Sequence, residues 1–385
     1  MFSTMTLNQV LNITNSSPVD IFNFSIDQAI GILEEYLLRD HNFDGVTEII
    51  VVISYVFLMA VGILSNILIS YVILANRRDR SYRNLFILNL NISDIALCAF
   101  CMPFTLFELL RRSWPLGILM CKLVPFVQGS TVFVSAATVT AIALDRHYVI
   151  VNQNPNRCKE NKKYISLYTG AMWIISLILS LPICLSQTIK SVGLPGILVY
   201  EKCIEQWAWP HGKGLYTLMI MTVQLVIPAT VLAVMHFRIK AHLNMSIAQH
   251  DSSCSERLNK ELSRNRRATM ILSTIAIVFT ISWLPWNVLN LVADFHPSSM
   301  SPRNLYVAFA ACHLIAMTSA VTNPILYGWL NTNIRQELIR MVTAFLSMKG
   351  NSNIRMEFDD SNVRTALAEM TNVEIRKSPN LEFNV

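Results

Sequence analysis

Long, nearly uncharged stretches alternate with short polar segments along most of this chain. A helix needs about 20 mostly apolar residues to cross a bilayer, and only structures that satisfy their own backbone hydrogen bonds can do so. The pattern therefore predicts an all-α membrane protein, a bundle of seven transmembrane helices. The predicted spans are Ile49–Ala75, Asn84–Phe107, Ile118–Leu144, Tyr164–Ile189, Gly214–Met235, Ala268–Ala293 and Asn304–Ile334.

Composition supports this interpretation, and the placement of charge predicts how the chain is oriented in the membrane. Hydrophobic residues make up 53% of the chain and charged residues 15%, whereas a soluble domain carries about 25% charged residues. Lysine and arginine gather in the segments after the first, third and fifth spans. Such basic segments stay on the cytoplasmic side, so the N-terminus is expected outside and the C-terminus inside. These loops account for the net charge of +6, which therefore does not indicate nucleic-acid binding.

Residues 1–46 are expected to form an extracellular tail. It contains acceptor sequences for N-glycosylation at Asn12, Asn15 and Asn23, and these are typical of surface loops in secreted or extracellular regions. No basic segment followed by a short apolar core precedes them, so the first span rather than a cleavable signal peptide is expected to direct insertion. The tail is also acidic, which would either steer a cationic ligand toward the protein or merely keep the segment solvated.

Two cysteines on the expected outer side are candidates for a disulfide. Cys121 opens the third span, and Cys203 lies between spans four and five. A bridge there would tie a long loop to a helix end and stabilise the fold by roughly 2–4 kcal/mol. The sequence contains no cysteine or histidine spacing typical of a metal site.

Asp94 is the only acidic residue deep inside a predicted span. A carboxylate at the bilayer centre costs about 2.5–3.5 kcal/mol on insertion scales, so it should face a polar interior. Candidate neighbours from other spans are Asn66, Ser135, Ser319 and Asn323. Together they could hold a sodium ion, the only metal expected; the alternative is a hydrogen-bonded polar cluster without an ion.

Asp145-Arg146-His147 stands where the third span meets a polar segment. Charges at the end of a membrane helix are costly unless they pair or reach water, so the triplet is either a latch on the cytoplasmic side or a membrane anchor. Prolines beside aromatic residues mark two candidate hinges, because proline removes a backbone hydrogen bond and kinks its helix. The hinge groups are Phe279, Trp283 and Pro285 in span six and Asn323, Pro324 and Tyr327 in span seven.

The order of these elements resembles the rhodopsin-like family of G-protein-coupled receptors from about Ile49 to Phe345. The matching residues are Asn66, Leu90, Asp94, Cys121, Asp145-Arg146-His147, Trp173, Pro228, Phe279, Trp283, Pro285, Asn323, Pro324 and Tyr327. The resemblance implies a receptor without enzymatic activity, in which Asp145 holds Arg146 at rest and Arg146 engages a heterotrimeric G protein when released. Trp283 and Phe279 would transmit ligand contact to an outward swing of span six. No cofactor is implied beyond the sodium ion.

The resemblance also divides the chain. Residues 47–330 would form the seven-transmembrane domain, and residues 331–347 a short amphipathic helix along the membrane surface. Residues 348–385 would form a polar cytoplasmic tail, expected to be disordered. Its serines and threonines are candidate phosphorylation sites, so arrestin and a receptor kinase are expected partners beside the G protein. Lipid of the plasma membrane would surround the spans.

Other classes of protein with seven spans fit the sequence less well. A retinal protein needs a lysine in span seven, and that span has none. A transporter or channel that uses Asp94 is the alternative from another class, but transporters usually carry internal repeats, and none is found. A receptor for small amines would need a carboxylate in span three where this chain has Gln128, and no acid precedes Asp145 in that span.

The stretch Cys121-Lys122-Leu123-Val124-Pro125-Phe126-Val127-Gln128 closely resembles the neuropeptide Y and short neuropeptide F receptor branch. Other positions that agree are Thr105, Ser180-Leu181-Pro182, Cys203, Glu205, Trp207, Asn290, Asp294 and His313. The resemblance implies an amidated neuropeptide that ends in arginine and an aromatic residue, of the neuropeptide Y/F or RFamide kind, and coupling to the inhibitory Gi/o class. A receptor for another peptide class is the nearer alternative.

The chemistry of these positions suits such a ligand. Asp294 and Asn290, one helical turn apart, can receive a guanidinium group. Gln128 and His313 can donate to and accept from a neutral carboxamide. The alternative is that Gln128 is a satisfied polar residue in a wet cavity and that Asp294 merely faces water. Further contacts or negative potential at the mouth are expected from Thr105, Glu108, Glu201 and Glu205.

Two features depart from the family pattern. His236 stands in span five where the family usually has a tyrosine that supports the active state beside Arg146 and Tyr327. A histidine there could hydrogen-bond and add pH dependence, because histidine titrates near neutral pH. The second cytoplasmic loop has its proline, Pro155, two residues later than the family pattern, which indicates an insertion in a segment that contacts the G protein.

Overall fold

The structure is a computed structural model that describes residues 30–31, 41–75, 82–151, 162–194, 197–249, 256–296, 301–330, 334–340 and 343. Some side chains within these ranges are not described, those of Arg146 and Tyr327 among them. The predicted glycosylation residues Asn12, Asn15 and Asn23 lie outside the described residues. The chain divides after Arg335 into two units, and the helical bundle belongs to the first.

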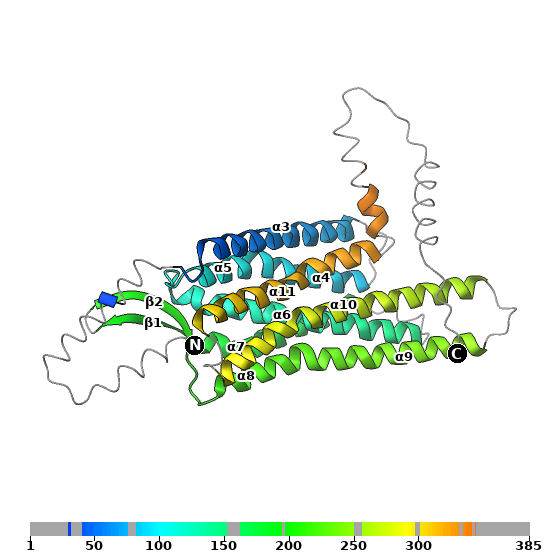
Figure 1. The fold of residues 1–385 in the computed structure, drawn as a ribbon. Helices are drawn as coiled ribbons and strands as arrows, with labels where there is room; N and C mark the ends of the chain where they lie inside the picture. Colours follow the sequence, from blue (N-terminus) through cyan, green and yellow to red (C-terminus); the bar gives the residue numbers. More distant parts are fainter. Residues whose placement is uncertain are drawn as a thin grey trace, which may run out of the picture. The chain divides into compact units, whose positions relative to one another are not determined.

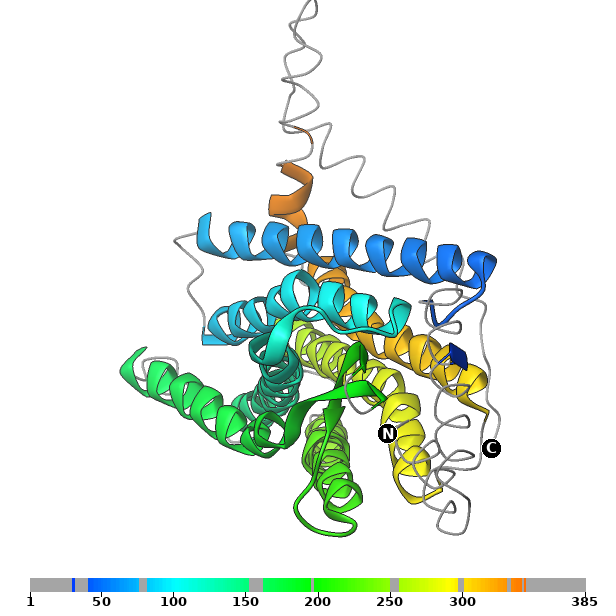
Figure 2. The ribbon, with the colours of Figure 1, turned by 90° about the vertical axis from the view of Figure 1, so that its left-hand side faces the viewer.

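Seven helices long and apolar enough to cross a membrane lie side by side in the described part of the chain (Figures 1 and 2). Spans two and five are each built from three consecutive helical segments. The prediction of a seven-transmembrane bundle is confirmed. The elements are α3 (Gly45–Ala75), α4 (Tyr82–Ala96), η1 (Leu97–Cys101), α5 (Met102–Leu110), α6 (Gly117–Val151), α7 (Lys162–Ser186), α8 (Gly212–Met221), η3 (Thr222–Val226), α9 (Ile227–Gln249), α10 (Glu256–Phe295) and α11 (Pro302–Leu330).

The outward faces of the helices are apolar. On α3, for example, Ile53, Phe57 and Leu64 are 62%, 64% and 68% exposed. A soluble protein rarely exposes a continuous apolar surface of this kind. The faces therefore fit a surface that contacts lipid.

Several helices extend beyond the ends that hydrophobicity predicted. α10 begins at Glu256 rather than Ala268, and α9 continues to Gln249 rather than ending at Met235. These extensions are polar, so an apolar pattern could not mark them. α7 instead ends at Ser186, and the predicted helix up to Ile189 is wrong because strand β1 begins at Gln187.

An antiparallel hairpin that the sequence pattern did not predict connects α7 with α8. Strand β1 (Gln187–Leu194) pairs with strand β2 (Ile197–Glu205), with a shift in register between Val192 and Gly193. Both strands contain several isoleucine, valine or threonine residues, which favour extended backbone. The hairpin lies at the end of the bundle where α3 begins and α10 ends (Figure 1), and we call this the hairpin end.

Two π-helical segments stand directly before prolines. η1 precedes Pro103, and η3 precedes Pro228. Proline has no N–H and clashes with the carbonyl four residues earlier. In both spans that carbonyl lies inside the π-helical segment, whose wider turn accommodates the ring. The missing N–H of each proline accounts for a distortion at its position, but the sequence does not specify the π-helical form.

Polar side chains inside the bundle join neighbouring helices. Trp173 Nε1 on α7 donates to Asn89 Oδ1 on α4 at 2.9 Å, and Asn89 Nδ2 donates to Thr138 Oγ1 on α6 at 2.7 Å. Asn66 Nδ2 on α3 donates to the carbonyl of Ala320 on α11 at 2.9 Å. Because no water competes inside a bilayer, such bonds are retained and set how the helices face one another.

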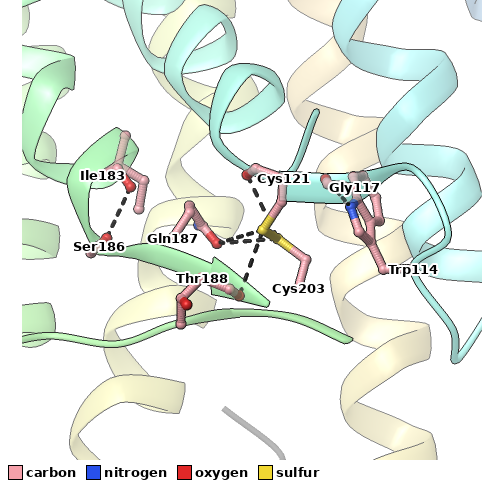
Figure 3. The surroundings of a disulfide bond; sticks show 8 residues. All are labelled: Trp114, Gly117, Cys121, Ile183, Ser186, Gln187, Thr188 and Cys203. Atoms are coloured by element: carbon pink, nitrogen blue, oxygen red, sulfur yellow. Dashed lines mark hydrogen bonds between the residues drawn. A yellow bond between two sulfur atoms is a disulfide. The ribbon is translucent and has the colours of Figure 1, made fainter. Parts of the chain in front are cut away.

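The predicted disulfide between Cys121 and Cys203 is present and ties β2 to the start of α6 (Figure 3). Gln187, at the start of β1, lies beside both sulfur atoms. The backbone N–H of Trp114 donates to the carbonyl of Glu201 at 2.7 Å, and its indole donates to the carbonyl of Gly117 at 3.0 Å. The hairpin is thus fixed to the loop before α6 as well as to α6.

A short helical stretch covers residues 334–340. Within the second unit, which begins at Gln336, Arg340 pairs with Glu337 at 3.2 Å. A membrane-surface helix over residues 331–347 stays a prediction, as do the other boundaries proposed from the sequence, at residues 1–46, 47–330 and 348–385.

Candidate functional site

A cavity of about 350 Å³ lies between the helices at the hairpin end. Most of its lining comes from α5, α6, β2, α8, α10 and α11, with further residues from α7, β1, η3 and the segment before α6. Trp283, which lies well inside α10 and is 3% exposed, marks its inner end. Acidic and basic side chains both line it. Negative potential at the mouth was expected from the sequence, whereas the described lining residues carry charges of both signs. The charged lining residues are Glu108, Arg111, Arg112, Lys202, Glu205 and Lys213.

A chain of hydrogen bonds runs from the cavity wall into the bundle. Thr105 Oγ1 donates to Gln128 Oε1 at 3.3 Å, and Gln128 Nε2 lies 3.3 Å from His313 Nε2. On the other side of the imidazole, His313 Nδ1 lies 2.7 Å from Tyr55 Oη. With the Gln128 amide donating to Nε2, the neutral ring carries its proton on Nδ1 and donates it to Tyr55.

His313 is held rigidly at this position. The side chain is 0% exposed. Its ring stacks on Tyr55 with centroids 5.7 Å apart, and Trp286 meets it edge-on at 5.0 Å. Thr105 and Gln128 line the cavity, whereas His313 is not among the described lining residues. The structure thus brings three of the predicted ligand contacts into one chain, with Gln128 at the cavity and His313 behind it.

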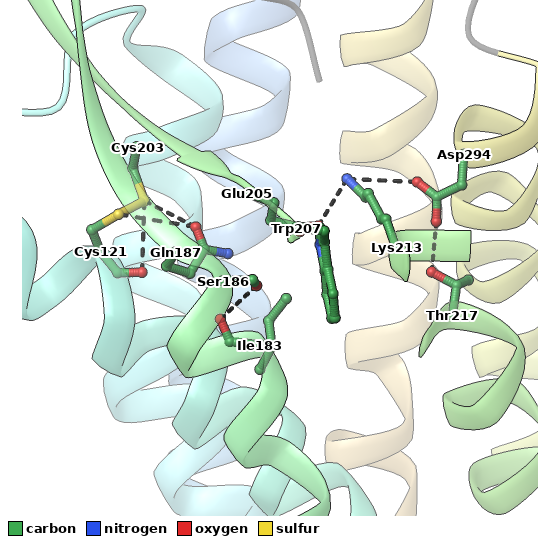
Figure 4. Close-up of polar contacts among 10 residues, drawn as sticks. All are labelled: Cys121, Ile183, Ser186, Gln187, Cys203, Glu205, Trp207, Lys213, Thr217 and Asp294. Atoms are coloured by element: carbon green, nitrogen blue, oxygen red, sulfur yellow. Dashed lines mark hydrogen bonds and ion pairs between the residues drawn. A yellow bond between two sulfur atoms is a disulfide. The ribbon is translucent and has the colours of Figure 1, made fainter. Parts of the chain in front are cut away.

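A second polar group lies where β2, α8 and α10 meet (Figure 4). Lys213 Nζ lies 3.0 Å from Glu205 Oε2 and 3.5 Å from Asp294 Oδ1. Thr217 Oγ1 donates to Asp294 Oδ2 at 2.6 Å, and Trp207 Nε1 donates to Glu205 Oε2 at 3.3 Å. Lys213 is therefore shared between two acidic side chains from different elements.

Asn290 and Asp294 differ in their access to the cavity. Asn290 lines it and donates through Nδ2 to the carbonyl of Trp286 at 2.8 Å. The side chain of Asp294 is 1% exposed and is not among the described lining residues, whereas Lys213 and Glu205 are. The predicted guanidinium acceptor is thus covered by a lysine.

Close packing of α8 on α10 brings Lys213 to Asp294. A Cβ on Gly214 would lie 2.7 Å from Phe295 Cζ, so the ring of Phe295 would have to shift to admit a larger side chain. α8 begins after His211, whose φ of 63° is left-handed and turns the chain into the helix. Glycine at position 214 lets the two helix ends approach, so Lys213 can reach across to α10.

The buried acid Asp94 lies among hydroxyl and amide groups from α6 and α11. Its Oδ2 accepts from Asn323 Nδ2 at 3.0 Å, and its Oδ1 lies 3.5 Å from Ser135 Oγ. Ser135 Oγ is also 2.9 Å from Ser93 Oγ. Ser319 instead donates to the carbonyl of Ala316. Carboxylate and hydroxyl oxygens are the ligands that a hard cation prefers, so this residue set fits sodium.

Trp283 connects the cavity with this polar interior. Its indole Nε1 donates to Ser319 Oγ at 3.0 Å. Phe279, one turn away on α10, packs against it with ring centroids 6.2 Å apart, and Pro285 lies in the same helix. Pro324 follows Asn323 inside α11. Contact with Trp283 can therefore reach α11 through one hydrogen bond.

The opposite end of the bundle carries the charged triplet at the end of α6. Asp145, Arg146 and His147 are helical, but the side chains of Arg146 and Tyr327 lie outside the description, so the latch stays a prediction. Burial lowers the pKa of His147, and the charges of Arg238 and His242 lower it further.

His236 lies at the same end of the bundle, on α9. Its ring packs edge-on against the neighbouring Phe237, with centroids 6.1 Å apart. This contact places the side chain but does not test its expected role beside Arg146 and Tyr327. Any pH dependence that His236 confers stays a prediction.

Some residues at the site were not singled out from the sequence. Lys213 is one of them, and it contacts Glu205 and Asp294. Tyr55 and Trp286 were not noted at all, because an aromatic residue in an apolar span carries no signal of what it contacts. The isolated positive charge of Lys213 beside an apolar span was the signal available.

Comparison with known proteins places this fold and cavity in a family. The family described as "7 transmembrane receptor (rhodopsin family)" matches residues 65–327. The chain is 33% identical over 340 residues to the neuropeptide F receptor of Drosophila melanogaster, covering 85% of this chain and 67% of that protein. It is 29% identical over 341 residues to the human neuropeptide Y receptor type 2, covering 87% and 86%. It is 30% identical over 306 residues to the neuropeptide Y receptor type 6 of Oryctolagus cuniculus, covering 76% and 80%.

The chain therefore belongs to the rhodopsin family of seven-transmembrane receptors. Within that family it falls in the branch of the neuropeptide F and neuropeptide Y receptors. Family membership also confirms that it is a receptor rather than an enzyme. Seven apolar helices together with this family make it a multi-pass protein of the plasma membrane.

Proposed function

We propose that this protein is a receptor for an amidated peptide ending in arginine and an aromatic residue, and that it activates a heterotrimeric G protein of the Gi/o class. The observation that carries the proposal is the cavity at the hairpin end, which is lined by Gln128 and Glu205, with His313 directly behind Gln128 and Asp294 behind Lys213. The names of its relatives, neuropeptide F and neuropeptide Y receptors, agree with a peptide ligand. We also propose that the N-terminus lies outside the cell, so that the cavity opens to the exterior.

Gln128 suits a terminal carboxamide, and His313 behind it fixes the orientation of the glutamine amide. A carboxamide is neutral and both donates and accepts hydrogen bonds, and so does the glutamine amide. A free carboxylate beside Gln128 would bury a charge without a partner, which costs far more than burying an amide. We therefore expect the cavity beside Gln128 to bind the amide form of the peptide in preference to the free acid.

Glu205 and Asp294 suit the arginine of the ligand. Carboxylates bind a guanidinium group through paired, charge-assisted hydrogen bonds. Asn290, which lines the cavity one turn from Asp294, supplies a further polar contact. The basic lining residues Arg111, Arg112 and Lys202 suit acidic groups elsewhere in the peptide.

The test is a comparison of matched peptides on cells that express the receptor. Peptides ending in Arg-Phe-amide and Arg-Tyr-amide are expected to stimulate nucleotide exchange on Gi/o, and their free-acid forms are expected to be at least about tenfold weaker, a difference of about 1.4 kcal/mol. The preference for amide over acid should shrink in Gln128→Leu, which keeps the size of the side chain and removes its hydrogen bonds. A response to unrelated peptides alone would instead indicate a receptor for another peptide class, and ion flux without nucleotide exchange would indicate a channel or transporter.

We also propose that arrestin and a receptor kinase act on the receptor through its C-terminal tail, and that sodium binds at Asp94 as an allosteric modulator. Asp94→Asn keeps the size of the side chain and removes its charge, so peptide potency in this variant is expected to become independent of sodium concentration. Potency in the unmodified receptor should change when sodium is replaced by N-methylglucamine. Equal sodium dependence in both proteins would argue for a polar cluster without an ion.

A further inference from the structure

Lys213 occupies the position that the proposed ligand arginine requires. Its Nζ lies 3.0 Å from Glu205 Oε2 and 3.5 Å from Asp294 Oδ1, as Figure 4 shows. The lysine side chain is 28% exposed and lines the cavity, whereas Asp294 is 1% exposed. A group entering from the cavity therefore meets Lys213 before it meets Asp294.

The pairing of Asp294 is incomplete on the side of Lys213. Asp294 Oδ2 is well satisfied by Thr217 at 2.6 Å. Asp294 Oδ1 is buried and accepts no hydrogen bond from the described residues, and Lys213 Nζ at 3.5 Å lies beyond the usual N–H···O distance of about 2.7–3.2 Å. One ammonium group is thus shared between two carboxylates, whose charge it offsets only in part, and it hydrogen-bonds well only to Glu205.

A guanidinium group would fit the same position better than the ammonium group. It offers five N–H donors in a planar fork, whereas an ammonium group is a compact point charge. A planar fork can donate to one carboxylate at each edge. The two acids come from different elements, β2 and α10, so a group that bridges them also joins those elements.

We propose that Lys213 is a resident cation that the arginine of the peptide displaces from Glu205 and Asp294, so that Lys213 sets the selectivity of this cavity for arginine. The inference rests on the proposed peptide ligand. Without a ligand, Lys213 offsets part of the charge of the acid pair and holds β2 to α8 and α10. When the ligand arginine takes its place, the lysine swings toward the cavity mouth, on a flexible four-carbon stem that permits the movement.

The experiment compares two substitutions that act in opposite directions. Lys213→Met keeps the length of the side chain and removes the competing charge. Potency of an Arg-Phe-amide peptide is expected to rise by about twofold to fivefold, within the range for removing a partly exposed ion pair. Lys213→Arg places a guanidinium group permanently between the acids, and potency of the same peptide is expected to fall by a similar factor.

A matched peptide in which citrulline replaces arginine controls for general effects on folding. Citrulline has the shape of arginine without its charge, so its peptide should show little change between the two variants. Receptor at the cell surface is measured by biotinylation, and potencies are compared at equal surface level. Lys213→Arg retains the charge and therefore tests the proposal even if Lys213→Met folds poorly.

Other results would overturn the proposal. A loss of arginine-peptide potency in both variants would mean that Lys213 binds the ligand directly, for example through an acidic group. Equal shifts for the arginine and citrulline peptides would mean that the lysine acts only on structure. Failure of the unmodified receptor to respond to any amidated peptide would remove the proposed function itself, whereas an unchanged response in both variants would remove only the displacement by arginine.

Discussion

Replacement of Cys203 by serine is expected to cause the largest loss of receptor among the substitutions considered. The disulfide joins residues separated by 82 positions. Closing a loop of that length restricts the unfolded chain by about 4.5 kcal/mol in the chain-entropy model. The bond also holds β2 over the cavity, so Glu205 would lose its position beside Lys213. We expect little receptor at the cell surface and a strongly reduced response to amidated peptides, measured by biotinylation and nucleotide exchange.

The chain offers a matched control for this change. Cys184 lies near the end of α7 and is a free cysteine, so Cys184→Ser tests the loss of a thiol alone. Cys121→Ser should resemble Cys203→Ser, and the double variant should be no worse than either, because both remove the same bond. Surface levels near those of the unmodified receptor in Cys203→Ser would mean that the hairpin is held mainly by its hydrogen bonds.

Asp294→Asn is expected to have the largest effect on ligand selectivity. Asparagine keeps the shape of the side chain and its contact with Thr217, but it removes the charge that would receive the ligand arginine. Potency of an Arg-Phe-amide peptide should fall by at least about tenfold, or about 1.4 kcal/mol. Concentration–response curves for nucleotide exchange measure the change, with the citrulline peptide as the comparison.

Comparing the potency changes of the arginine and citrulline peptides shows what Asp294 does. A fall confined to the arginine peptide would support charge recognition at this carboxylate. Similar losses for both peptides would mean that Asp294 mainly holds α8 to α10 through Thr217 and Lys213. An unchanged response to the arginine peptide would remove Asp294 from the proposed binding site and leave Glu205 as the acid to test.

The spans of the bundle were predictable because lipid imposes a simple requirement on each of them. Apolar length located all seven helices and proline located the distorted turns, but neither could mark the polar continuation of α10 toward Glu256 or the π-helical form of the distortions. The hairpin between α7 and α8 was missed for a related reason. Its pairing depends on two strands meeting in space, which the hydrophobic pattern of either strand does not reveal.

The binding site was predictable in its members but not in their arrangement. The sequence indicated Gln128, His313 and Asp294 as polar residues near one end of three spans. It could not show that His313 lies behind Gln128 against Tyr55, since that depends on how the helices are rotated. Nor could it show that Lys213 covers Asp294, which requires the close approach of α8 and α10 at a glycine.

The glycine contact between α8 and α10 also fixes where α10 can pivot. One end of α10 packs closely against α8 beside Gly214, and Pro285 lies inside the helix part of the way along. The arm from Pro285 back to Glu256 is roughly 44 Å long at about 1.5 Å per residue. A bend of about 10° at the proline would therefore carry the far tip sideways by roughly 8 Å. Trp283 lies only two residues from this proline. A displacement of a fraction of an ångström at Trp283 would therefore correspond to a displacement of several ångströms at the Glu256 end of α10.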